Sequence, residues 1–246
     1  MLRCACRTAM AVLLLALPPG GCGIWRPPEP SEAQLQRGLL VLYPGAFNAR
    51  LELSVVATTL RDSGYDLAYE IIPWGYTETQ LIDPIGTHDS TMRFAQREAQ
   101  RIADYRRHYP DGAVILFGYS AGGFTALKVA EALPDGARAA RVILLSPSIS
   151  RHYDLAPALE RTEREIVVFF SPFDAVSQLV GLLLRGNDLV RGDSAAMFGF
   201  SMRHERIVQI GWSPDMLAFA SIGMHWDQFA NPAWLRTYLL PWFTLP

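Results

Sequence analysis

Short apolar runs alternate with amphipathic stretches along most of the chain. The runs are continuously apolar or rich in β-branched residues, and few of them alternate apolar with polar positions. Continuous apolar runs are typical of strands that are covered on both faces, as in a parallel sheet. We therefore expect strands at residues 39–43, 67–72, 113–117, 141–145, 165–170 and 206–212.

The segments between these runs have the character of helices. We expect helices at residues 51–63, 90–108, 121–133 and 231–243. Strands that alternate with helices form βαβ units, so the pattern predicts one doubly wound α/β domain with a mostly parallel sheet and helices on both faces. The segment 146–164 between two strands is short, which predicts a small lid or none. In such sheets the functional residues follow the carboxyl ends of the strands.

The first thirty residues differ in composition from the rest. Arg3 and Arg7 precede a short apolar run from Met10 to Pro18, which is the pattern of a secretory signal. The run is far shorter than the roughly 20 residues that span a bilayer. The small residues before Cys22 resemble a bacterial lipoprotein signal, in which cleavage leaves an acylated cysteine, although Pro19 stands where that motif usually has leucine.

Three segments follow from this composition. Residues 1–21 are the expected signal peptide, residues 22–36 a Pro-rich spacer with lipid attachment at Cys22, and residues 37–246 the folded domain. The protein is then expected in the cell envelope, as a membrane-anchored lipoprotein on the periplasmic side or the outer surface. Secretion as a soluble protein and an uncleaved N-terminal tail are the alternatives.

Composition excludes some kinds of site. Every cysteine of the chain (Cys4, Cys6 and Cys22) precedes the predicted domain, which therefore has no disulfide, thiolate metal cluster or cysteine nucleophile. The net charge is −2 at pH 7 and no long block of one sign occurs, so the chain has no basic surface of the kind that binds nucleic acid.

One serine stands between glycines directly after a predicted strand. Gly118, Ser120 and Gly122 match the pattern G-x-S-x-G, which forms a sharp turn between a strand and a helix. Such a turn exposes the Ser120 hydroxyl above the sheet and directs the Ala121 amide toward an oxyanion. The alternative interpretation is an ordinary turn in which Ser120 caps the helix.

A serine nucleophile needs a histidine base that an acid orients. His225 follows the last predicted strand and precedes the last predicted helix, which favours it over His88 in a polar loop and over His108, His152 and His204. Asp174 lies just beyond the fifth strand and is the favoured acid. Asp215, beyond the sixth strand, is the rival.

The order Ser120, Asp174, His225, each after a strand, resembles the α/β-hydrolases. The resemblance covers about residues 38 to 243. It implies an α/β-hydrolase fold and a serine hydrolase of the carboxylesterase type, which forms an acyl-enzyme on Ser120 and needs no metal or organic cofactor. It also implies a second oxyanion amide from Ala46 or Phe47, beside that of Ala121.

Several aromatic residues neighbour the proposed site in the sequence. Trp74, Tyr119, Phe173 and Trp226 are candidates for the wall of an apolar pocket for the acyl group of a small ester substrate, and core packing is the alternative for each. An acyltransferase with the same three residues, and a binding lipoprotein without activity, are the alternative functions.

Lipid attachment gives a direct prediction. Replacing Cys22 by serine removes the thiol that would carry the acyl chains, so Cys22→Ser is expected to leave the membrane fraction while the wild type stays in it. Fractionation of lysed cells measures this distribution. Equal membrane association of both proteins would contradict acylation at Cys22.

Overall fold

The structure is a computed structural model that describes residues 29–46, 50–74, 84–183 and 185–244. The predicted signal peptide and Cys22 lie outside these ranges, so export and lipid attachment stay predictions. No helix within the described ranges combines the length and the apolar character that crossing a bilayer requires.

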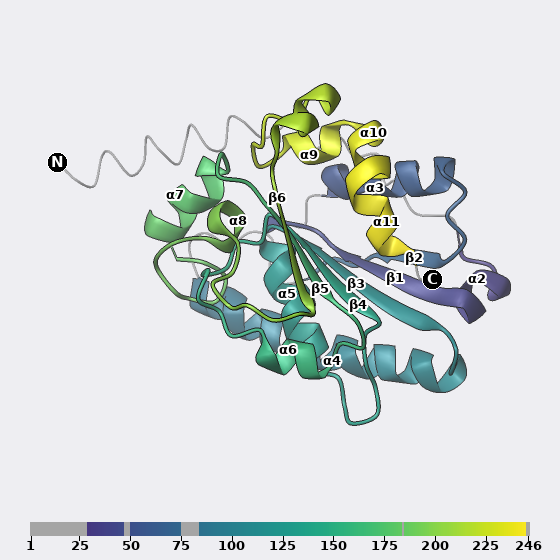
Figure 1. Ribbon diagram of the computed structural model, residues 1–246. Coiled ribbons are helices and arrows are strands. Elements are labelled where there is room, and N and C mark those ends of the chain that lie inside the picture. Colours follow the sequence, from purple (N-terminus) through teal and green to yellow (C-terminus); the bar gives the residue numbers. More distant parts are fainter. Residues whose placement is uncertain (1–28, 47–49, 75–83, 184, 245–246) are drawn as a thin grey trace.

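Six parallel strands form one sheet in the order β2-β1-β3-β4-β5-β6. They are β1 (Gly38–Tyr43), β2 (Ala68–Ile71), β3 (Ala113–Tyr119), β4 (Arg141–Leu145), β5 (Ile166–Phe170) and β6 (Ile207–Gly211). Each lies within two residues of a predicted apolar run. Helices lie on both sides of the sheet (Figure 1), which confirms the predicted fold class, a doubly wound, mostly parallel sheet with helices on both faces.

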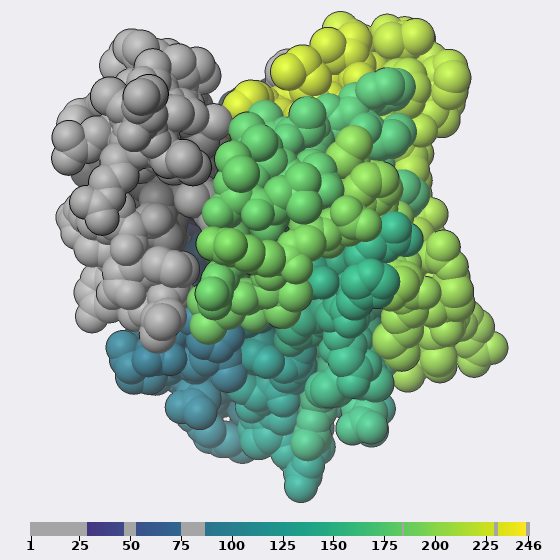
Figure 2. Space-filling view, turned by 90° about the vertical axis from the view of Figure 1, so that its left-hand side faces the viewer, coloured from purple at the N-terminus to yellow at the C-terminus, as the bar shows by residue number. Residues whose placement is uncertain are grey.

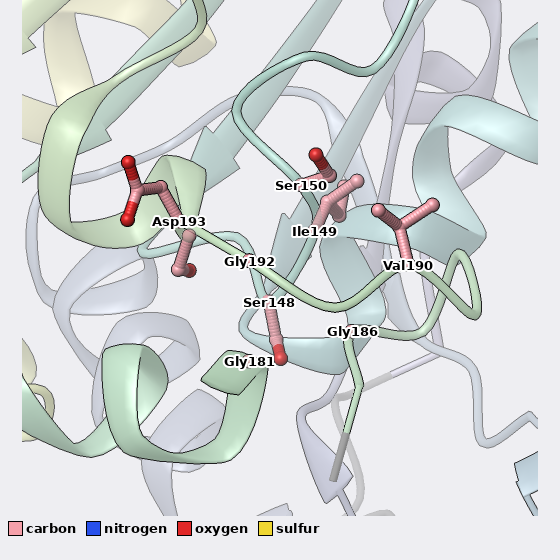
Figure 3. Close-up of a pocket in the computed structure, with 9 residues that line it drawn as sticks. Ser148, Ile149, Ser150, Gly181, Gly186, Val190, Gly192 and Asp193 are labelled. Carbon is pink, nitrogen blue, oxygen red and sulfur yellow. The ribbon is translucent and has the colours of Figure 1, made fainter. Parts of the chain in front are cut away.

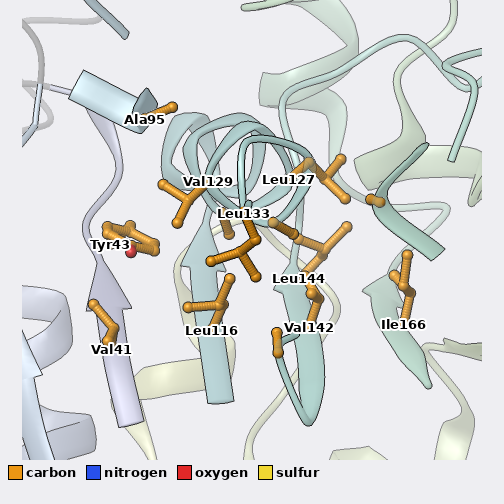
Figure 4. Close-up of a cluster of buried hydrophobic side chains, with 14 of the residues drawn as sticks. Val41, Tyr43, Ala95, Leu116, Leu127, Val129, Leu133, Val142, Leu144 and Ile166 are labelled. Carbon is orange, nitrogen blue, oxygen red and sulfur yellow. The ribbon is translucent and has the colours of Figure 1, made fainter. Parts of the chain in front are cut away.

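One face of the sheet is covered by α4 (Pro84–His108), α5 (Ala121–Glu131) and α6 (Ala156–Glu160). Alternate strand residues such as Val41, Leu116 and Leu144 point toward Leu127 and Val129 of α5 (Figure 4). These side chains are fully buried. Because the opposite face is covered as well, the strands are apolar at successive positions and not only at every second one.

The opposite face is covered by α3 (Arg50–Asp62) and by the C-terminal helices. Leu42, Ile115 and Phe117 of the strands pack there together with Leu53 of α3 and Phe243 near the C-terminus. The last segment contains the helix that the sequence predicts, continuous from residue 232 to residue 243, but a π-helical turn interrupts its α-helical pattern. It comprises α9 (Asp227–Ala230), α10 (Pro232–Trp234), the π-helical turn η3 (Leu235–Leu239) and α11 (Leu240–Phe243).

Proline accounts for part of this interruption. Pro241, in the first turn of α11, has no amide hydrogen and cannot donate to the preceding turn, so the regular α-helical hydrogen-bond pattern is broken there. A second proline begins a helix earlier than expected: α4 starts at Pro84, a favoured first helical residue, and not at residue 90. His88 therefore lies in a helix and not in the polar loop expected from the sequence.

An additional helix, α2 (Glu32–Arg37), occupies the end of the segment expected to be a spacer. The side chains of Ser31 and Gln34 form a capping box at its start, and the hydroxyl of Tyr105 donates a hydrogen bond to the carbonyl of Leu35. Ordered structure thus begins before residue 37.

Short helices follow the strands at the carboxyl edge of the sheet. The connection from β4 to β5 contains only α6, in agreement with a small lid or none. After β5 come α7 (Ala175–Leu183) and α8 (Ala195–Phe198), and after β6 comes the 3₁₀-helix η2 (Pro214–Phe219). The segments that follow β3, β5 and β6 carry the residues of the candidate site.

Candidate active site

Ser120 occupies a strained turn between β3 and α5. Its backbone has φ 52° and ψ −118°, a conformation that non-glycine residues rarely adopt. Its side chain makes no capping hydrogen bond to α5, so the interpretation of Ser120 as a helix cap is wrong. The hydroxyl instead lies 3.0 Å from Nε2 of His225.

The glycines on either side of Ser120 are required by close backbone contacts. A Cβ on Gly118 would lie 2.3 Å from the carbonyl oxygen of Gly122, and a Cβ on Gly122 would lie 2.2 Å from the carbonyl oxygen of Tyr43. Both distances are far below van der Waals contact. A side chain is therefore excluded at Gly118 by the first turn of α5 and at Gly122 by the end of β1.

His225 lies in a loop that the carboxylate of Asp227 holds together. This carboxylate accepts hydrogen bonds from the amides of Ile222, at 2.6 Å, and Met224, at 3.0 Å. The hydroxyl of Tyr119, next to Ser120, donates to the carbonyl oxygen of His225 at 3.1 Å. The imidazole is therefore positioned from both sides, by its own loop and by β3.

Asp174 completes a chain of hydrogen bonds. Its Oδ2 lies 2.8 Å from Nδ1 of His225, and the side chain is fully buried. Its Oδ1 accepts the amide of Ser177 at 3.1 Å, the pattern of a residue that caps the start of α7. The N-terminus of a helix favours negative charge, so α7 supports a carboxylate at this position.

The rival acid, Asp215, lies elsewhere. It is part of η2, and its Oδ2 accepts a hydrogen bond from the hydroxyl of Tyr238. Hydrogen bonds from Ser213 and from Tyr238 lower the pKa of Asp215, which is exposed to solvent. The structure thus brings Asp174, and not Asp215, to His225.

Each of the other histidines has a different neighbour. Nδ1 of His88 lies 3.1 Å from the carbonyl oxygen of Asn187, and Nδ1 of His152 lies 3.1 Å from Oγ of Ser201. His204 accepts the amide of Arg206, and the ring of His108 packs against Tyr109. None of these contacts involves Ser120.

The loop after β1 lies beside the elbow. A Cβ on Gly45 would be 3.3 Å from Cβ of Ser120, which places the backbone around Ala46 close to the nucleophile. Ala121 opens α5, whose first amides have no acceptor within the helix. The amides of Ala46 and Ala121 stay the predicted oxyanion donors, whereas Phe47, the other predicted donor, lies outside the described residues.

The four aromatic residues proposed for a pocket have two different environments. Trp74 and Tyr119 are almost fully buried; Trp74 donates from Nε1 to the carbonyl of Pro44 at 2.8 Å and thereby supports the loop after β1. Phe173, directly before Asp174 in the sequence, is 53% exposed. Trp226, directly after His225, is 37% exposed. Only these two present apolar surface to solvent.

A narrow recess without room for a water molecule lies where the chain leaves β4 (Figure 3). Its walls come from residues 148–150, from Gly181 of α7 and from the loop 186–194. The amide of Ser148 donates to the carbonyl of Ser120 at 3.1 Å, so this recess adjoins the elbow. The carboxylate of Asp188 accepts the amide of Ser150 at 2.9 Å and fixes the loop against this wall.

Sequence reasoning missed two residues that contact the site, Ser177 and Asp227. Oγ of Ser177 lies 3.0 Å from Nδ1 of His225, and the spacing of three residues from Asp174 was the available signal. In the described ranges no three His, Cys, Asp or Glu side chains are grouped so that they could hold a metal ion.

Comparisons with known proteins give structural neighbours only. No protein-family model matches the chain, and no curated protein matches it. Among solved structures, dienelactone hydrolase from Anabaena variabilis is similar, with 20% identity over 85% of this chain and 89% of the other, and a TM-score of 0.44.

Two further solved structures are similar over most of the chain. An esterase from Pyrobaculum calidifontis has 13% identity over 84% of this chain and 73% of its own, with a TM-score of 0.46. A thioesterase from the prodiginine biosynthetic pathway in Streptomyces coelicolor has 16% identity over 80% and 86%, with a TM-score of 0.42.

The contact between the elbow and β1 gives a prediction about stability. Gly122→Ala places a Cβ against the Tyr43 and Pro44 carbonyl oxygens, at 2.2 and 2.4 Å, so the backbone must move. We expect a loss of more than about 3 kcal/mol in the free energy of unfolding. Thermal unfolding should show a midpoint about 6 °C lower or more.

Gly136→Ala is the matched control, because Gly136 has φ +84° and no atom lies within 4 Å of the position that a Cβ would take there. This variant should lower the free energy of unfolding by only about 1–2 kcal/mol, the cost of placing alanine in a left-handed backbone conformation. Equal destabilisation by the two variants would contradict the close contact at Gly122.

Proposed function

We propose that the protein is a serine hydrolase that cleaves carboxylic esters through an acyl-enzyme on Ser120. One observation carries the proposal: an unbroken chain of hydrogen bonds runs from the buried Asp174 through His225 to the hydroxyl of Ser120. These three residues come from different segments of the chain and meet at the carboxyl edge of the sheet. Such a chain activates a serine hydroxyl by giving its proton a base.

Acylation begins when Oγ of Ser120 attacks the ester carbonyl and its proton passes to Nε2 of His225. The carboxylate of Asp174 stabilises the imidazolium that forms, 2.8 Å from Nδ1. The carbonyl oxygen becomes an alkoxide and accepts hydrogen bonds from the amide of Ala121 and from an amide of the loop at Ala46 and Phe47. Removing one such donor typically costs about 3 kcal/mol of transition-state stabilisation.

His225 then returns the proton to the leaving alcohol as the ester C–O bond breaks, which leaves the acyl group on Ser120. In the second half of the reaction His225 takes a proton from water, and the hydroxide attacks the acyl-enzyme. The acid departs and the proton returns to Ser120. The neutral imidazole is regenerated in each half of the reaction, so the only reactant consumed besides the ester is water.

Apolar surface near the site supports an apolar acyl group. All the large apolar side chains that are exposed in the described ranges come from residues 173–226, the part of the chain that also carries Asp174 and His225. They are Phe173, Leu179, Leu182, Leu183, Val190, Phe198, Leu217, Ile222, Met224 and Trp226. The segment with α7 and α8 forms the centre of the face shown in Figure 2. Phe173 and Trp226 adjoin Asp174 and His225 in the sequence, and exposed apolar side chains beside a site are typical of one that receives an apolar partner.

Loss of the nucleophile or of the base gives the first functional prediction. Ser120→Ala and His225→Ala are each expected to reduce ester turnover by more than about 10⁴-fold, because neither variant can form the acyl-enzyme efficiently. Turnover of p-nitrophenyl esters of increasing chain length measures this, and added alcohols reveal any transfer to acceptors other than water. Circular dichroism checks the fold. Full activity in folded Ser120→Ala would contradict the proposal.

A comparison of two aspartate variants tests which carboxylate orients His225. Asp174→Asn leaves an amide opposite Nδ1 of His225 and favours the wrong imidazole tautomer, so the turnover number is expected to fall by about 10³- to 10⁴-fold. Asp215→Asn is the matched control and should leave turnover nearly unchanged, because Asp215 contacts Tyr238 on the surface. A larger loss in Asp215→Asn than in Asp174→Asn would reverse the assignment.

A further inference from the structure

A fourth side chain contacts the imidazole of His225. Oγ of Ser177 lies 3.0 Å from Nδ1, the nitrogen that also faces Oδ2 of Asp174 at 2.8 Å. Ser177 is 3% exposed, so water does not compete strongly for its hydroxyl. The residue belongs to the first turn of α7, and its amide donates to Oδ1 of Asp174 at 3.1 Å. One residue thus contacts both the acid and the base.

The charge of Asp174 decides the direction of the hydrogen bond. A neutral imidazole carries one hydrogen, and Nδ1 without it would place a lone pair 2.8 Å from a buried carboxylate oxygen. That arrangement is repulsive, so the hydrogen belongs on Nδ1. The hydroxyl of Ser177 must then accept, and Nδ1–H is shared between Ser177 and Asp174. The lone pair of Nε2 remains directed at Ser120.

We propose that Ser177 is a positioning residue, whose hydroxyl is a second acceptor for the Nδ1–H of His225 and keeps the imidazole in the tautomer and orientation that take the proton of Ser120. This inference rests on the proposed function. Two acceptors on different atoms restrict rotation of the ring, whereas one acceptor permits it. The same two contacts strengthen when the imidazole becomes charged during acylation, because hydrogen bonds from charged donors are stronger than neutral ones.

Ser177→Ala tests the role of the hydroxyl, since alanine retains the amide that donates to Asp174. The turnover number for an ester substrate should fall about three- to tenfold, the size expected from loss of one hydrogen bond. KM should stay unchanged, because the buried hydroxyl of Ser177 faces His225 and not the surface. Ser177→Thr keeps a hydroxyl and should restore most of the activity.

Ser146→Ala is the matched control. Ser146 directly follows β4 and is 1% exposed, and its hydroxyl has no hydrogen-bond partner among the described residues. Its removal therefore deletes a buried hydroxyl at the same edge of the sheet without loss of a contact to His225, and activity should match the wild type.

A spectroscopic measurement separates this inference from the proposed function. In protein labelled with ¹⁵N-histidine, the Nδ1–H signal of His225 is assigned by its loss in His225→Gln. The chemical shift of this signal should change in Ser177→Ala and stay the same in Ser146→Ala, whether or not any ester is turned over. An unmoved signal in Ser177→Ala, or a loss of activity that appears equally in Ser146→Ala, would overturn the role of Ser177. Absence of turnover in the wild type with a moved signal would overturn the proposed function alone.

Discussion

The geometry of the candidate site depends on the contact between the turn after β3 and the end of β1. The backbone of α5 passes so close to the carbonyl oxygen of Tyr43 that only glycine fits at residue 122. This contact fixes the position of Ser120 above the sheet and brings Gly45 within reach of it. The strained backbone of Ser120 is held in place because β1, β3 and α5 are packed on both sides.

The buried Asp174 shows how the fold supports a charge away from water. A carboxylate without solvent is costly unless other groups satisfy its oxygens. Here Oδ1 faces an amide at the start of α7 and Oδ2 faces His225, so each oxygen has a partner. The carboxylate therefore caps a helix and holds the imidazole at the same time, and Ser177 joins the two roles.

The sequence predicted all six strands of the described sheet and the residues of the Asp174–His225–Ser120 chain. Continuous apolar runs identified the strands of the sheet because both of its faces are covered, and the glycines around Ser120 identified the elbow. Position after the fifth strand favoured Asp174 over Asp215, but both follow strands, and only the tertiary contact of Asp174 with His225 separates them. No helix was predicted at residues 175–183, so nothing marked Ser177 as part of a helix start. The π-helical turn before Pro241 was also not predicted, although Pro241 was the available signal for it.

The central claim is that Asp174 and His225 activate the hydroxyl of Ser120, and labelling with a fluorophosphonate tests it most directly. Such a probe forms a stable adduct only with an activated serine, and mass spectrometry of peptides locates it. The account predicts one adduct on Ser120 in the wild type, none in Ser120→Ala and very slow labelling in His225→Ala. A folded wild type that forms no adduct, or an adduct on another serine, would contradict it.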